Sequence, residues 1–365
     1  MDDSIGLTPE GCRARNKELR ERMREANLDA LLVCDRRYVN YLTGYWTPAI
    51  FNSVVLVERN GPTTLVAPPG ALGDAATADV RLSFEAQKLA TLIDDQLGEA
   101  LAQIAQPLAS VGRLGVDGPC GPPQTGAREW VDARPILWAM KRFKHDDEVA
   151  LLRRAIAATE SAYAYAKRTL APGITEIDLC AGMLAEATRA SGEIIGEIGN
   201  DFQVGSPGGS PRRRAAQAGE IAVFDIGVTI QGYRGDMCRS FVVGGEPTPA
   251  QQEAHERVVA ALTYVEKTAA PGVSCAGLFH DVVDQLRNDR GWSFPHHLGH
   301  GIGINPHEAP RLNPHWNDTF AVGDLFVSEP ALYADELRAG LRIENAFVMR
   351  ETGAEKLTTF PTDLV

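Results

Sequence analysis

The sequence predicts a two-domain α/β protein whose larger, C-terminal domain consists of two similar halves. Three observations predict this fold class. The chain has 365 residues, of which 44% are hydrophobic, and a chain of this length usually divides into more than one core. Amphipathic helices alternate with short apolar strands. A succession of helix, helix and strand also occurs twice in the second part of the chain.

Residues 1–140 are expected to form the smaller α/β domain. Within it, 14–33 reads as a charged amphipathic helix followed by a short apolar strand. The runs "SVVLV" and "TTLVA" read as further strands, each closed by Gly or Pro. A long helix is expected to start near Lys141. We therefore place the boundary there and assign 141–365 to the second domain.

The second domain carries the repeat. The segment "LAPGITEIDLC" from Leu170 has a counterpart in "AAPGVSCAGLF" from Ala269, and in both copies the Pro-Gly pair ends a helix. The strands that follow repeat too. The segment "GEIAVFDIG" aligns with "GDLFVSEPA", and in this alignment Asp225 corresponds to Glu329. An internal duplication is the simplest explanation.

The duplication pairs acidic residues at the ends of apolar strands. Because side chains alternate along a strand, Asp225 and Glu329 each close an apolar face. The next strand of each half adds a second acid, Asp236 and Glu344. An ionised carboxylate in an apolar layer needs a proton, a partner or a metal, and neighbouring acids raise one another's pKa. The pattern therefore predicts a cation site.

A histidine-rich segment follows the second helix pair. "HHLGHGIGINPHE", residues 296–308, holds four histidines on a backbone rich in glycine and proline. An imidazole added to the carboxylates would suit Mn, Co, Fe or Zn rather than a structural zinc bound by thiolates. Spacing alone does not say which histidine is the ligand.

Composition argues against several functions. The 36 Lys and Arg residues against 48 Asp and Glu residues give a net charge of −12, which argues against nucleic acid or an anionic membrane as a partner. No apolar run approaches the roughly 20 residues of a membrane span, and the N-terminal segment lacks a signal peptide's apolar core. Six scattered cysteines without a C-x-x-C pair are expected to be reduced. A cytoplasmic protein is therefore expected.

Four segments together resemble the pita-bread metallohydrolases, the family of prolidase, aminopeptidase P, methionine aminopeptidase and creatinase. They are "DIGVTIQGYRGDMCRS", "GHGIGINPHE", "SEPALY" and "RIEN", and 1–140 is similar to the creatinase-type N-terminal domain. The resemblance implies a pseudo-twofold β-sheet flanked by helix pairs, a homodimer, and two divalent metal ions, with Mn favoured over Co, Zn or Fe. The five ligands that it implies are Asp225, Asp236, His300, Glu329 and Glu344. Asp236 and Glu344 would bridge the two ions.

The resemblance also implies catalytic and substrate-binding residues. Glu329 could accept the proton of the attacking water. His307 would contact the tetrahedral intermediate, and His296 would line the substrate pocket. Arg342 and Tyr333 resemble substrate-contacting positions of aminopeptidase P. The implied reaction is hydrolysis of a small Xaa-Pro peptide by a metal-activated water.

One position departs from the family's pattern. Its peptidases carry a histidine about 17 residues before the first aspartate ligand, where this chain has Pro207 and Gly208. Loss of a donor aimed at the leaving amide should cost about 10²- to 10⁴-fold in rate. A second function therefore stays open, a metal-dependent hydrolase or lyase of a small non-peptide metabolite, similar to ectoine hydrolase or dimethylsulfoniopropionate lyase. A third, a non-catalytic binding module, is disfavoured by the intact ligand set.

A basic run, Arg212, Arg213 and Arg214 in "SPRRR", stands near the missing histidine. Short charged runs are usually solvated loops. Arginine also binds carboxylates through a bidentate fork, so a clamp for an anionic substrate group is the alternative. Both interpretations stay open at this point.

Overall fold

The structure is a computed structural model that describes residues 6–69, 77–118, 127–195, 198–199 and 201–365. Contacts within the chain divide it into two compact units. One comprises the described residues up to Lys141 together with 145–147, and the other comprises 142–144 and 148–365. Each unit has a hydrophobic core of its own.

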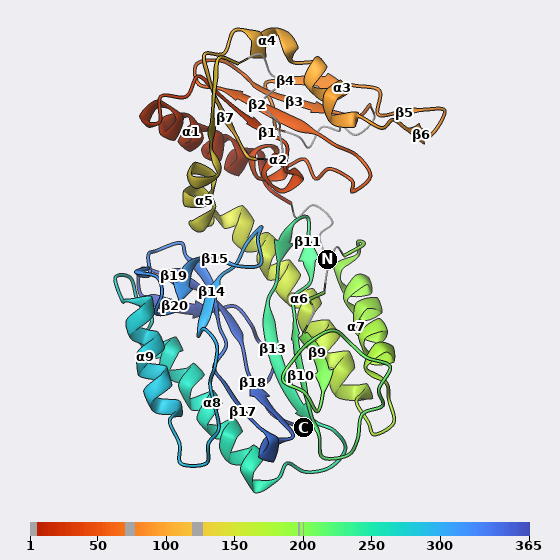
Figure 1. Cartoon of the computed structure of the whole chain (residues 1–365), viewed down its shortest axis with the longest axis vertical. Helices are drawn as coiled ribbons and strands as arrows, with labels where there is room; N and C mark the ends of the chain where they lie inside the picture. The colour runs from red at the N-terminus through yellow and green to blue at the C-terminus, as the bar shows by residue number, and fades with distance from the viewer. Residues whose placement is uncertain (1–5, 70–76, 119–126, 196–197, 200) are drawn as a thin grey trace. The chain divides into compact units, whose positions relative to one another are not determined.

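The first unit is an α/β domain around a six-stranded mixed sheet (Figure 1). The sheet order is β4-β3-β2-β1-β7-β8. Its strands are β1 (Ala30–Val33), β2 (Val54–Glu58), β3 (Thr63–Ala67), β4 (Val80–Ser83), β7 (Arg113–Val116) and β8 (Glu129–Asp132), and β5 (Gln87–Lys88) pairs with β6 (Thr91–Leu92) separately. The helices are α1 (Pro9–Glu25), α2 (Arg36–Thr43), α3 (Gln96–Ala102), α4 (Ala105–Ala109) and α5 (Arg134–Arg142). The helix and strand predicted for 14–33 are confirmed as α1 and β1.

The second unit contains two main sheets, with orders β13-β10-β9 and β15-β14-β16-β19-β20. Their strands are β9 (Asp201–Val204), β10 (Ile221–Ile226), β13 (Met237–Val242), β14 (Gly299–Gly301), β15 (Glu308–Leu312), β16 (Leu325–Ser328), β19 (Asn345–Arg350) and β20 (Gly353–Lys356). The smaller elements are β11 (Thr229–Ile230), β12 (Tyr233–Arg234), β17 (Ala331–Ala334), β18 (Ala339–Arg342) and the 3₁₀ turn η2 (Asp335–Leu337).

Four helices flank these strands, in two pairs (Figure 1). They are α6 (Asp146–Thr169), α7 (Glu176–Ser191), α8 (Pro249–Thr268) and α9 (Cys275–Leu286). Helix α7 packs on β9, α8 packs on β18 and β20, and α9 packs on β15. In the part of the chain that the structure describes, no helix is both long and apolar enough to cross a membrane.

The internal duplication extends to individual hydrogen bonds. Between the helices of the first pair, Gly173 N donates to Ala216 O at 2.9 Å, and between those of the second pair Gly272 N donates to Phe320 O at 2.7 Å. Both glycines have positive φ, 96° and 86°, which a residue without a Cβ adopts at little cost. The predicted fold of two similar halves, with helix pairs on the outside, is confirmed.

The long helix begins later than the sequence suggested. It was expected to start near Lys141, but α6 begins at Asp146. Phe143 forms an isolated β-bridge with Asp324, and the extended backbone of that bridge interrupts the helical pattern. The apolar period continues on both sides of the interruption, which explains why the sequence pattern did not reveal it.

One expectation about the cysteines is wrong. Cys34 is disulfide-bonded, whereas Cys12, Cys180, Cys238 and Cys275 are free. Cys120 lies outside the described residues. Pairing depends on distance in the folded chain, and the scattered spacing of the cysteines carries no information about that distance.

Candidate metal centre

A cavity of about 810 Å³ in the second unit gathers most of the predicted site. All five predicted metal ligands line it: Asp225, Asp236, His300, Glu329 and Glu344. His307 and Arg342 line it as well. Of the remaining predicted site residues, His296 and Tyr333 are not among the described residues that form its wall.

The two halves supply acids from equivalent places. Asp225 lies near the end of β10, and Asp236 directly precedes β13, the antiparallel partner of β10. In the second half, Glu329 directly follows β16, and Glu344 directly precedes β19, the antiparallel partner of β16. Each strand pair therefore brings its two acids to the same end, where the cavity lies.

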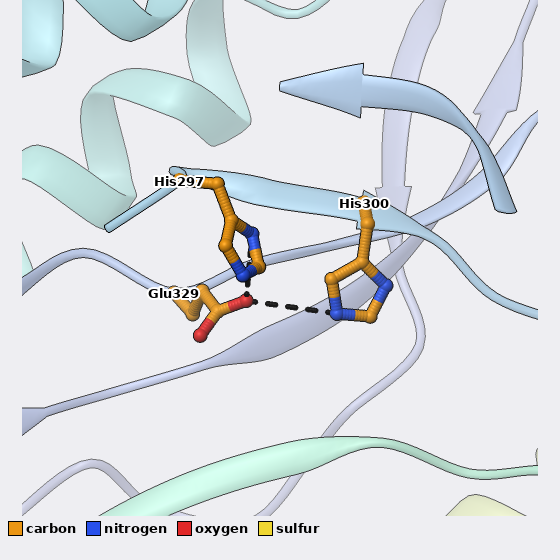
Figure 2. Close-up of side chains that lie close together, drawn as sticks. All are labelled: His297, His300 and Glu329. Carbon is orange, nitrogen blue, oxygen red and sulfur yellow. Dashed lines mark ion pairs between the residues drawn. The ribbon is translucent and has the colours of Figure 1, made fainter. Parts of the chain in front are cut away.

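Two groups of side chains have ligand atoms within 4.8 Å of one another. One group is Asp236, His300 and Glu344, all of them buried, and the other is His297, His300 and Glu329. Figure 2 shows both rings of the second group turned toward one carboxylate oxygen. Nδ1 of His297 lies 3.4 Å and Nε2 of His300 lies 3.6 Å from Oε1 of Glu329. Because His300 belongs to both groups, it joins them into one centre.

The hydrogen bond of His300 leaves its Nε2 available to a metal. Nδ1 lies 3.1 Å from the carbonyl oxygen of Gly301, which can only accept, so Nδ1 carries the proton. Burial lowers the pKa of His300 well below its usual value, and the nearby His307 lowers it further. The two rings are stacked with their centroids 3.7 Å apart. His300 is therefore neutral at pH 7, in the form that coordinates metals.

The acids are buried close together, as expected of ligands for a cation. Burial, the largest cause, raises the pKa of Asp225 to about 6 and raises the pKa of Glu329 and Glu344 well above their usual range. Repulsion between these carboxylates acts in the same direction. Among the described residues, none forms a hydrogen bond with the buried Oε2 of Glu344. Carboxylates with one or two imidazoles fit a divalent ion such as Mn, Fe, Co or Zn.

Arg342 lies among these acids. Its Nη2 is 2.8 Å from Oδ2 of Asp201 and 3.2 Å from Oδ2 of Asp225. Its Nε contacts the sulfur of Cys238 at 3.4 Å. Arg342 was predicted to contact substrate, and in the structure it neutralises part of the negative charge in the cavity wall. Asp201, which also lines the cavity, was not identified from the sequence.

His296 and Tyr333 form a hydrogen-bonded pair. Nδ1 of His296 lies 2.8 Å from the carbonyl oxygen of His297, so Nδ1 is the donor and Nε2 accepts from the Tyr333 hydroxyl at 3.0 Å. Burial lowers the pKa of His296 to about 4, so the pair is neutral at pH 7. His296 was predicted to line the substrate pocket, whereas it is His297 that contacts Glu329. Neighbouring histidines offer no spacing that would distinguish the two.

The basic run is occupied by ion pairs within the protein. Arg212 Nη2 lies 2.6 Å from Oε1 of Glu176, and Arg214 pairs with Glu220. Arg213 is exposed. None of the three arginines is among the described residues that line the cavity. These contacts favour a loop fastened to its surroundings over a substrate clamp.

Gly208 packs against Asp201. A Cβ built on Gly208 would lie 2.8 Å from Cγ and from Oδ2 of Asp201. The next residue, Gly209, donates its backbone N–H to the other carboxylate oxygen of Asp201 at 2.9 Å. The Asp201 carboxylate therefore occupies the space that a side chain at position 208 would need.

We expect the metal-free protein to lose stability as the pH rises from about 4 to above 6, because the folded-state pKa of Asp225 is raised from 3.8 to about 6. The protonated carboxyl stabilises the fold fully below the unfolded-state value, and this contribution is lost as the pH rises through the folded-state value. Added Mn²⁺ should reverse the trend, since it binds the ionised form. Thermal melts with chelator and with Mn²⁺ at a series of pH values measure both curves, and parallel curves would contradict the assignment.

The sequence is similar to those of known peptidases. Residues 150–351 match the model of metallopeptidase family M24, and 15–128 match the creatinase/prolidase N-terminal domain. A putative dipeptidase of Bacillus subtilis is 29% identical over 252 residues, which cover 66% of this chain and 67% of that protein. The Xaa-Pro dipeptidase of Pyrococcus horikoshii is 23% identical, over 96% of this chain and 98% of that protein.

Solved structures show the same fold. The prolidase from Pyrococcus horikoshii superposes with a TM-score of 0.80 at 21% identity, covering 96% of this chain and all of that one. Aminopeptidase P from E. coli superposes with a TM-score of 0.79 at 20% identity, covering 98% of this chain and 97% of that one. The predicted architecture of a creatinase-type N-terminal domain and a pita-bread domain is therefore confirmed.

Proposed function

Because the chain belongs to metallopeptidase family M24, whose members use divalent metal ions, we propose that it is a dinuclear-metal peptidase that cleaves Xaa-Pro peptides. One observation carries the proposal. Four acids and a histidine, drawn from both halves of the duplicated domain, line one cavity. A relative that matches nearly the whole chain is an Xaa-Pro dipeptidase, which supports the substrate class.

The proposed ligands are Asp225, Asp236, His300, Glu329 and Glu344, with Mn²⁺ as the preferred ion. Asp236 and Glu344 would each hold both ions, and His300 would hold one. When bound, two such ions polarise the scissile carbonyl and lower the pKa of a water toward neutrality. The homodimer and the cytoplasmic location stay predictions.

Residues in and near the cavity would transfer protons and bind the substrate. Glu329, which lines the cavity, is proposed to accept the proton of the attacking water. His307 lines the cavity, and burial lowers its pKa, so its neutral ring can donate one hydrogen bond to a developing oxyanion. His296, fixed by Tyr333, and Arg342 are proposed to orient the substrate.

A small non-peptide metabolite is the second candidate substrate. The observation that favours it is the glycine at 208, where the family's peptidases carry a histidine. The relatives named above are peptidases and do not favour it.

A substrate panel tests the proposal. The protein is stripped of metal, reloaded with Mn²⁺ and offered Xaa-Pro dipeptides, with the matching Xaa-Ala dipeptides as controls, together with small N-acyl and sulfonium compounds. Cleavage of Xaa-Pro dipeptides that stops with EDTA is the expected result. Turnover of a non-peptide compound with no dipeptide cleavage would instead support the second candidate.

We expect Gly208→His to lower the stability of the fold and not to raise the rate of peptide cleavage. The new Cβ would meet the Asp201 carboxylate at 2.8 Å, and such overpacking typically costs about 1–3 kcal/mol. Asp201→Ala removes the obstacle, so Gly208→His should be better tolerated in that background. Thermal melts and kcat/KM on an Xaa-Pro dipeptide measure both effects. A Gly208→His protein as stable as wild type, with faster cleavage, would contradict this expectation.

A further inference from the structure

Asp201 is a carboxylate of the cavity wall that belongs to neither group of candidate ligands. It lies at the start of β9, directly opposite Asp225 in the register between β9 and β10. Like charges opposite each other on neighbouring strands are destabilising. The fold therefore places an acid beside a proposed ligand, and this arrangement needs compensation.

Arg342 provides the compensation by contacting both acids with one nitrogen. Its Nη2 lies 2.8 Å from Asp201 and 3.2 Å from Asp225, so the shorter contact is with Asp201. The Arg342 side chain is 8% exposed, that of Asp225 20% and that of Asp201 34%, so solvent screens the contact with Asp225 less than the contact with Asp201. How the guanidinium is shared between the two acids therefore affects the charge that Asp225 presents to the cavity.

The Asp201 carboxylate is held from its other side as well. Oδ1 accepts from Gly209 N at 2.9 Å, while Oδ2 faces Arg342. Gly208 leaves the space that the carboxylate occupies, because any Cβ there would lie within 3.0 Å of three Asp201 atoms. The conformation of Asp201 is thus fixed by the Gly209 N–H, by the Arg342 guanidinium and by the lack of a side chain at Gly208.

We propose that Asp201 is a positioning residue that holds Arg342 and so keeps Asp225 available to a divalent cation. The inference rests on the proposed role of Asp225 as a ligand. Without the Asp201 charge, Arg342 would pair with Asp225 alone and compete with the cation for the same oxygens. Asp201 would also add a negative charge near a cation held by Asp225. Removing a residue that orients a metal ligand typically lowers metal affinity by about 10- to 100-fold.

Gly208 belongs to the same arrangement. A glycine in place of the family's histidine is required here because Asp201 uses the space. Gly208 is not among the described residues that line the cavity, but the carboxylate for which it leaves room lines the cavity and contacts Arg342. Gly208 is therefore linked to the proposed metal site through Asp201.

Metal affinity of the full chain tests the proposal directly. The metal-free protein is titrated with Mn²⁺ by calorimetry, which needs no substrate. Asp201→Asn keeps the shape and the acceptor for Gly209 N but removes the charge, and we expect it to weaken Mn²⁺ binding about 10- to 100-fold. Glu220→Gln is the matched control, since Glu220 directly precedes β10 and pairs with Arg214 without lining the cavity. The control should bind Mn²⁺ like wild type.

A second variant tests the role of Gly208. Gly208→Ala should weaken Mn²⁺ binding in the wild-type background by displacing the carboxylate, but not in an Asp201→Ala background, where there is no carboxylate to displace. Additive effects in this cycle would overturn the link between the two residues. Equal affinity of Asp201→Asn and wild type would overturn the role of Asp201 and leave the proposed function standing. A wild-type protein that binds no divalent metal would overturn both.

Discussion

Replacing Asp236 with alanine should release the metal ions and abolish hydrolysis together. Asp236 is buried, and its carboxylate belongs to the group formed with His300 and Glu344. As the proposed bridge, it would be a ligand of both ions, so its loss affects both. We expect kcat/KM to fall by more than the roughly 10²- to 10³-fold that one lost electrostatic contact costs. Elemental analysis of the purified variant measures the metal content alongside.

Stability separates loss of a ligand from loss of the fold. Burial raises the pKa of Asp236, so the ionised carboxylate lowers the stability of the metal-free protein at pH 7. Metal-free Asp236→Ala should therefore melt no lower than metal-free wild type, while Mn²⁺ should stabilise only the wild type. Asp363→Ala, which changes an exposed aspartate paired with Lys167, serves as the control that keeps its metal. A folded Asp236→Ala protein that retains two ions would refute the ligand set.

Lys144→Met should lower the stability of the fold strongly, although it preserves most of the side chain's length. Lys144 Nζ contacts Oε2 of Glu308 at 2.7 Å, and both side chains are only 1% exposed. Oε1 of Glu308 accepts from Asn305 N at 2.9 Å, so the pair fastens the segment that carries His307. Removing one partner of a buried pair typically costs about 3–5 kcal/mol. For a domain of this size, each kcal/mol lowers Tm by about 2–4 °C.

Two further variants make this prediction specific. Lys144→Met combined with Glu308→Gln should recover most of the loss, because no charge is left buried and the amide oxygen can still accept from Asn305 N. Arg153→Met is the control, since Arg153 pairs with Glu355 and the two side chains are 44% and 41% exposed, so no charge is left buried. It should cost less. Equal melting temperatures for Lys144→Met and wild type would show that the pair does not stabilise the fold.

The sequence predicted the acids of the candidate site because the duplication marks them twice. Asp225 and Glu329 occupy equivalent places after apolar runs, and Asp236 and Glu344 equivalent places before the next strands. Patterns of this kind follow from strand periodicity, which is local and visible in one sequence. The helix pairs, the strands and the division into halves were predictable for the same reason.

Residues that act through distant partners left no such pattern. Asp201 and Arg342 are 141 positions apart, and Lys144 and Glu308 are 164 apart, so neither pair has a spacing to recognise. One signal was available for Asp201. Strand β9 pairs with β10 as the histidine-bearing β14 pairs with β16, so the duplication itself predicts a functional strand at β9.

The duplicated halves have a consequence for how the domain opens. Each half supplies two of the four acids, so ions bound between them would tie β10 and β13 to β16 and β19. Binding adds stability by mass action, about 4 kcal/mol at a free metal concentration 1,000 times Kd. Because residues of both halves already share one hydrophobic core, bound metal would add to the cooperativity between them. Amide hydrogen exchange should show higher protection of these strands in both halves with Mn²⁺ than after chelation.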